Sequence, residues 1–135
     1  MNKDTRLPIG YYLKKADNLL TEGINKIHEE LGLTRTGWQI LNMINERGSV
    51  DSPTIKKLLL EFETGKKIDD FIYGLIDSGL VKEHKFLSLT DKGKEVFKIC
   101  LEKQTAFRHK AMRNITDNDY EQIIATLEKL IGNLS

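Results

Sequence analysis

Apolar side chains recur at steps of three and four residues along most of this chain, the spacing that places them on one face of an α-helix. The first such stripe runs from Ile9 to Leu31, and the last from Tyr120 to Leu134. Local start and stop signals divide the pattern into six predicted helices: residues 8–31, Thr34 or Thr36 to Arg47, 53–61, 64–78, 91–113, and a last helix that follows Thr116.

Residues with special backbone chemistry mark several of these ends. Ser52 is predicted to cap the third helix, with Pro53 as its first residue, because a serine hydroxyl accepts a free backbone N–H and proline has none to leave unpaired. Pro8 fits the first turn of the first helix for the same reason. Gly79 follows the fourth helix and suits the left-handed backbone of a C-terminal cap.

The pattern changes after Gly79. Residues 80–83 and 86–89 predict two short strands, with His84-Lys85 as a tight turn between them. A short helix, a turn, a second helix and a hairpin make a winged helix-turn-helix. We therefore expect a mainly α fold with a small β-hairpin wing, in one domain spanning residues 1–135.

The predicted winged helix-turn-helix forms a lobe that covers residues 34–90, and long helical segments flank this lobe. They cover residues 8–33 and 91–135, and their apolar stripes are broader than one small core can bury. Either these stripes pack within one subunit or they pair with a second copy of the chain, and we favour pairing.

Composition sets limits on function. The formal net charge is +1, so the chain as a whole does not advertise a nucleic-acid partner. The single cysteine excludes an internal disulfide framework. No apolar run approaches the roughly 18 residues of a membrane span, and no signal peptide is evident. We expect a cytoplasmic protein that makes no membrane contact.

Four segments in order resemble the MarR family of transcriptional regulators. They are "LPIGYYLKKADNLL" in the first helix, "LGLTRTGWQILNMINERG" in the second, "LIDSGLVKE" at the end of the fourth, and "LSLTDKGKEVF" at the entry to the fifth. The resemblance covers about residues 8–133. It implies a homodimer that binds a pseudo-palindromic operator in double-stranded DNA, as a repressor, with a small aromatic effector as a further partner.

The wing departs from the family pattern. The family's wing is usually longer and carries an arginine that enters the minor groove, whereas no arginine lies between Val81 and Thr90 here. Lys82, His84 and Lys85 are the only sources of positive charge in this hairpin.

The fourth helix is the predicted recognition helix, with its N-terminal part in the major groove. Lys66 and Lys67 lie in its first turn, where cations oppose the helix dipole, so a nearby phosphate explains them better than helix stability does. The residues expected to contact DNA are Ser52, Thr54, Thr64, Lys66, Lys67, Asp70, Tyr73 and Lys85.

Acidic residues argue in the other direction. Asp69, Asp70 and Asp77 lie on or beside the exposed face of this helix, and a carboxylate either accepts from cytosine or repels phosphate. Residues 34–90 carry eight basic and eight acidic side chains, so the lobe has no net charge. Tyr73 fits a contact to sugar–phosphate or a thymine methyl equally well as a half-buried aromatic.

The resemblance also implies a dimer interface and an effector pocket. The interface residues expected are Ile9, Tyr12, Leu13, Ile123, Leu127, Leu130, Ile131 and Leu134. The pocket residues expected are Tyr12, Leu19, His28, Trp38, Met43 and His109, although Trp38 fits a simple core position better.

Other chemistry finds no support in the sequence. The three histidines are far apart, so no metal site is expected. No phosphate loop, catalytic triad or paired carboxylates appear, and we expect neither a cofactor nor an enzyme. The alternative to a regulator is a MarR-like protein-interaction module with weak or lost DNA binding.

Overall fold

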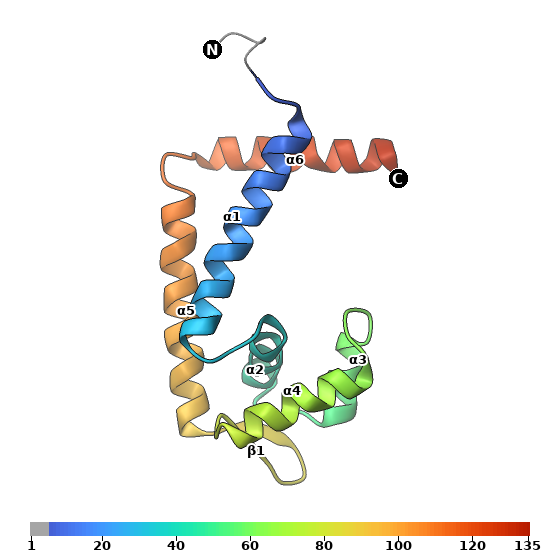
Figure 1. The fold of residues 1–135 in the computed structure, drawn as a ribbon, viewed down its shortest axis with the longest axis vertical. Coiled ribbons are helices and arrows are strands. Elements are labelled where there is room, and N and C mark those ends of the chain that lie inside the picture. Colours follow the sequence, from blue (N-terminus) through green and yellow to red (C-terminus); the bar gives the residue numbers. More distant parts are fainter. Residues whose placement is uncertain (1–5) are drawn as a thin grey trace.

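The computed structural model describes residues 6–135, which form six helices and one hairpin (Figure 1). In chain order the elements are α1 (Ile9–Glu30), α2 (Arg35–Arg47), α3 (Ser52–Leu59), α4 (Gly65–Asp77), β1 (Val81–Glu83), β2 (Leu87–Leu89), α5 (Asp91–Ala111) and α6 (Asp117–Leu134). The predicted fold class, mainly helical with a small hairpin after the fourth helix, is confirmed.

A lobe made of α2, α3, α4 and the hairpin holds the core. Each helix turns one apolar face inward: Ile40, Leu41 and Ile44 from α2, Ile55 and Leu59 from α3, and Ile68, Ile72 and Leu75 from α4. Burying a side chain of this size contributes about 1.5–3 kcal/mol. The hydrophobic effect therefore holds the three short helices together, since helices of 8 to 13 residues are marginal alone.

Side-chain caps fix where the helices begin. The hydroxyls of Thr34, Thr64, Thr90 and Thr116 each accept a backbone N–H three residues on. Thr34 and not Thr36 therefore caps α2, and Asp119 completes a capping box with Thr116.

Two predicted helix starts were wrong by one residue. The Asp51 carboxylate, not the Ser52 hydroxyl, caps α3, accepting from the Thr54 N–H at 2.8 Å. An ionised carboxylate accepts a charge-assisted bond, which is stronger than a hydroxyl's. Ser52 instead begins α3. Pro8 is the N-cap of α1 and lies outside its first turn, because its ψ of 152° is extended.

The hairpin is shorter than the predicted strands because only three residues of each strand pair. Val81 lies opposite Leu89, Lys82 opposite Ser88, and Glu83 opposite Leu87. Gly79, with a φ of +78°, turns the chain from α4 into β1 as expected. The hydroxyl of Thr90 donates to the carbonyl of Gly79, which ties the end of the hairpin back to its start.

The helices α1 and α5 pack along each other and form an arm that extends from the lobe (Figure 1). Gly23 allows this approach, because a Cβ at that position would overlap the ring of Phe107 on α5. At the lobe end of the arm, Trp38 stacks on Phe97 with ring centroids 4.8 Å apart, and it also stacks with His28 at 6.1 Å.

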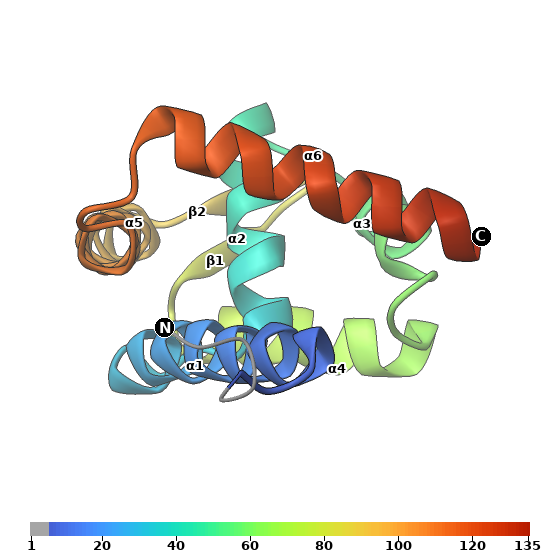
Figure 2. The ribbon, with the colours of Figure 1, turned by 90° about the horizontal axis from the view of Figure 1, so that it is seen from above.

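The last helix, α6, leaves the end of α5 that is far from the lobe and makes a steep angle with α5. It extends to the same side of α5 as the lobe (Figures 1 and 2). None of its residues is buried. The N-terminal half of α1 is likewise exposed. The two expected interface helices therefore present apolar side chains to solvent.

Candidate nucleic-acid interface

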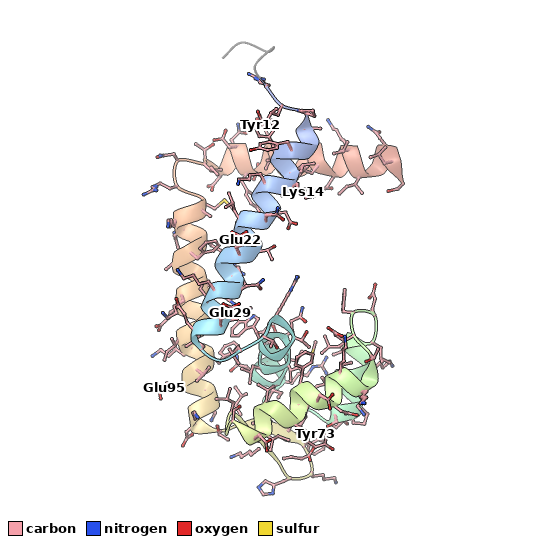
Figure 3. The ribbon with its side chains drawn as sticks, in the orientation of Figure 1. Tyr12, Lys14, Glu22, Glu29, Tyr73 and Glu95 are labelled. Carbon is pink, nitrogen blue, oxygen red and sulfur yellow. The ribbon has the colours of Figure 1, made fainter. Side chains whose placement is uncertain are left out.

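The helix α4 has one buried and one exposed face. Ile68, Ile72 and Leu75 point into the lobe, so residues at the opposite positions of the wheel face outward. Lys66, Asp70, Tyr73 and Asp77 are all exposed, as their positions on the wheel predict. Tyr73 is 64% exposed and points away from the lobe in the direction of the wing (Figure 3).

The N-terminus of α4 carries positive charge. Thr64 holds the N-cap by accepting from the Lys67 N–H at 3.3 Å, so its hydroxyl oxygen is already engaged. Lys66 and Lys67 lie in the first turn and are exposed, and the first turn of a helix carries backbone N–H groups without a partner in the helix. Lys67 lies 4.0 Å from Glu63, an exposed pair worth less than about 1 kcal/mol. Both lysines remain free to bind a phosphate.

One of the three aspartates is neutralised within the lobe. Lys56 on α3 lies 2.8 Å from Asp69 on α4, and this ion pair also joins the two helices. Lys56 and Asp69 lie on different helices, so no local sequence pattern predicts that they form an ion pair. Asp70 and Asp77 stay exposed and without an ion-pair partner among residues 6–135.

The start of α3 lies beside the same turn. Hydrogen bonds from Thr54 hold the pKa of the Asp51 carboxyl below its ordinary value, so Asp51 is ionised and keeps the cap in place. Ser52 and Thr54 are both partly exposed in the first turn of α3. At the wing, Lys85 is exposed and its Nζ lies 5.9 Å from the centre of the Phe86 ring.

The expected effector residues do not line one cavity. Tyr12 and Leu19 line an apolar groove of about 470 Å³, whose other wall is Ile123 and Leu127 of α6. His28 is buried beside Trp38 in the core, and Met43 packs against the same core. His109 is exposed on α5.

Most of the expected interface residues lie on open surface. Ile9, Tyr12 and Leu13 on α1 are exposed, as are Ile123, Ile131 and Leu134 on α6, while Leu127 and Leu130 are half-buried. Tyr12 lies near the N-terminal end of α1, where this helix passes α6 (Figure 3). No helix among residues 6–135 is long and apolar enough to cross a membrane. The same residues contain no cluster of three metal-ligating side chains.

No protein-family model matches this sequence, and no curated protein sequence is significantly similar to it. Solved structures do match. A MarR family protein of Mycobacterium tuberculosis, solved in complex with DNA, is 22% identical, with a TM-score of 0.72 over 93% of this chain and 98% of that chain.

MepR of Staphylococcus aureus, described as a transcription regulator of the multidrug efflux pump MepA, is 14% identical, with a TM-score of 0.77 over 96% of this chain and 100% of that one. A MepR variant bound to an oligodeoxyribonucleotide is 16% identical, with a TM-score of 0.70 over 96% of this chain and 100% of that chain. The chain has the winged helix-turn-helix fold of the MarR-family proteins.

Proposed function

We propose that this chain is a MarR-type transcription regulator that binds operator DNA as a homodimer and acts as a repressor. The observation that carries the proposal is the exposed face of α4, where Lys66 and Lys67 extend from the helix N-terminus and Tyr73 follows two turns later. A helix of this kind enters the major groove with its N-terminal residues toward the base edges.

The contacts divide by chemistry. Lys66 and Lys67 bind phosphate or guanine, while Ser52 and Thr54 donate to the sugar–phosphate backbone from the start of α3. Asp70 accepts from cytosine, and Tyr73 lies against sugar or a thymine methyl. Thr64 acts mainly as the cap that fixes α4.

The wing contributes little beyond charge. Its turn is short, and Lys85 is the basic residue nearest its tip. The lobe has no net charge, so its affinity for DNA depends on the local placement of a few lysines. Since phosphate neutralisation supplies most of the binding free energy, we expect one subunit to bind weakly and a dimer to bind usefully.

A second copy of the chain is the partner that fits α1 and α6. The accessible surface is 10173 Å², whereas a compact monomer of this mass exposes about 7200 Å². The surplus is about 3000 Å² per chain, so burying half or more of it in each subunit would give a total within the roughly 2000–5000 Å² that obligate homodimers bury. The groove between α1 and α6 is lined almost wholly by apolar side chains, which suits the apolar face of a helix from the second copy.

Control by a small aromatic effector remains a prediction from the resemblance. Trp38 provides its readout, because it is the only tryptophan and stacks with both His28 and Phe97 where α1, α2 and α5 meet. Binding at this junction would change the tryptophan fluorescence.

The test of DNA binding is a fluorescence-anisotropy titration with the DNA upstream of the protein's own gene, at two salt concentrations. We expect specific binding that weakens as salt rises. The Lys66→Ala/Lys67→Ala variant removes four lysines per dimer and should lower the salt slope by about three to four. The Lys26→Ala/Lys110→Ala variant, which removes the same charge from exposed positions on the arm, should bind like the wild type.

The absence of binding even at low salt would overturn the proposal. It would favour the protein-interaction module, in which the exposed acidic residues Asp70 and Asp77 face a protein partner. A wild-type slope in the Lys66→Ala/Lys67→Ala variant would mean that α4 does not carry the phosphate contacts.

A further inference from the structure

A small pocket opens on the lobe between the C-terminal end of α2, the hairpin and the N-terminal part of α5. Its volume is about 200 Å³. Ile44 and Leu89 form an apolar part of its lining, and Asn45, Lys82, Ser88 and Lys94 supply polar groups. It is separate from the exposed face of α4 and from the groove between α1 and α6, and shares no lining residue with either.

The fold brings these four polar residues together from four elements, α2, β1, β2 and α5. Lys82 and Ser88 are partners across the hairpin, so their side chains project from the same face. Lys94 follows on α5 after the Thr90 cap, which accepts the Gly93 N–H and places the first turn of α5 beside the hairpin. Gly93 allows this approach, because a Cβ there would overlap the Leu80 carbonyl.

The pocket is positively charged, whereas residues 34–90 as a whole carry no net charge. Two lysines line it, and no aspartate or glutamate does. Neither Lys82 nor Lys94 forms an ion pair with a carboxylate of residues 6–135. Both lysines are exposed, and two like charges beside one pocket repel each other.

We infer that this pocket binds one phosphate group. A phosphate placed between Lys82 and Lys94 replaces their repulsion by two charge-assisted contacts. The Ser88 hydroxyl and the Asn45 amide, neither of which makes a side-chain hydrogen bond within residues 6–135, donate to its remaining oxygens. The volume lies below the roughly 300–1000 Å³ of pockets for drug-sized ligands, which fits a single phosphate.

The phosphate has two sources with the same chemistry. It is either a backbone phosphate of DNA that runs past the side of the wing or the phosphate of a small free ligand. The first source rests on the proposed function, whereas the second does not. The pocket would in either case give the hairpin an anion contact that its missing arginine does not provide.

The first arm of the test is a titration of the full chain with inorganic phosphate, followed by amide NMR shifts at constant ionic strength in chloride. We expect saturable shifts centred on Asn45, Gly48, Lys82 and Ser88. The Lys82→Gln/Lys94→Gln variant should bind phosphate about tenfold or more weakly, and Ser88→Ala should weaken binding while keeping both charges. Lys26→Ala/Lys110→Ala is the charge-matched control and should titrate like the wild type.

The second arm distinguishes the sources by DNA titration of the same variants. A salt slope lowered by Lys82→Gln/Lys94→Gln but not by the control assigns the pocket to a DNA phosphate. An unchanged slope, together with the NMR shifts, assigns it to a free phosphate-bearing ligand. If wild type shows no localised shifts with phosphate and the DNA slope is unchanged, the inference is wrong, whatever the outcome for Lys66 and Lys67.

Discussion

The imidazole of His28 and the carboxamide of Gln104 meet across the interface of α1 and α5, with Nε2 of one 3.0 Å from Nε2 of the other. Both side chains are buried, and the Nδ1 atom of His28 has no hydrogen-bond partner. The pair therefore joins the two helices of the arm through a histidine whose uncharged form is favoured, because protonating Nε2 would remove the acceptor that faces the Gln104 amide nitrogen and would leave a charge in the core.

This burial makes the stability of the arm depend on pH. Desolvation, with a smaller contribution from the charge of Arg35, lowers the pKa of His28 below the ordinary histidine value of 6.5. The unfolded chain then binds a proton more readily than the folded one. The stabilisation is complete above pH 6.5 and is lost as the pH falls below it toward the lowered value. Urea unfolding at a series of pH values measures this slope.

His28→Gln is the variant that tests this origin. It keeps a polar side chain of similar length but cannot titrate, so its stability should change less than that of wild type between neutral and mildly acidic pH. His109→Gln, at an exposed position, should keep the wild-type slope. An equal slope in His28→Gln would place the titrating group elsewhere.

Gly23 and Gly74 form a matched pair of helix glycines. A Cβ at Gly23 overlaps the ring of Phe107, whereas a Cβ at Gly74 meets open space. Gly23→Ala should therefore destabilise the chain by about 1–3 kcal/mol through overpacking. Gly74→Ala should stabilise it by up to about 1 kcal/mol through helix propensity. Urea unfolding at one protein concentration compares them, and stabilisation by both would show that α1 and α5 are not in close contact at Gly23.

The proposed dimer interface on α6 predicts how one substitution changes the oligomeric state. Ile123 is 55% exposed and lines the groove beside α1, so Ile123→Arg would place a charge inside the proposed dimer interface. Light scattering after size exclusion should give twice 15.5 kDa for wild type and 15.5 kDa for the variant. Leu60→Arg, at an exposed leucine of the lobe, should stay dimeric. A monomeric wild type would refute the interface.

Asp70 tests whether the acidic face reads sequence. Asp70→Asn removes the charge that repels phosphate and also the strong acceptor for cytosine N4. Binding to unrelated DNA should therefore tighten, and the ratio of specific to non-specific affinity should fall, by roughly tenfold for one contact. Anisotropy with operator and scrambled duplexes measures both. A uniform gain with an unchanged ratio would mean that Asp70 touches no base.

Local chemistry explains how much of the fold could be predicted. Gly79 and the threonine caps act on residues within three or four positions of themselves, so the helix ends at these residues could be predicted from the sequence. The start of α3 was misassigned because Asp51 and Ser52 are adjacent and both are good caps. Only the position of the carboxylate relative to Thr54 separates them.

The candidate DNA-binding site and the pockets were harder to predict from the sequence, because they depend on contacts between elements that are distant in the chain. The three- and four-residue spacing of apolar side chains on α4 was enough to place Lys66, Asp70 and Tyr73 on the exposed face. No sequence pattern pairs Lys56 with Asp69, or brings Lys82 and Lys94 to one pocket. The expected effector residues do not form one site for the same reason. His28 and Trp38 pack in the core, whereas Tyr12 and Leu19 line the groove beside α6.

Methylation protection of guanine N7 on the operator tests the central proposal most directly, because N7 lies in the major groove. A dimer that places one α4 in each half-site should protect guanines in two patches centred about one helical turn apart, on one face of the duplex. Both patches should disappear together in the Ile123→Arg variant at the same protein concentration. A single patch that survives in that variant, or bound DNA without any protection in the major groove, would contradict the account.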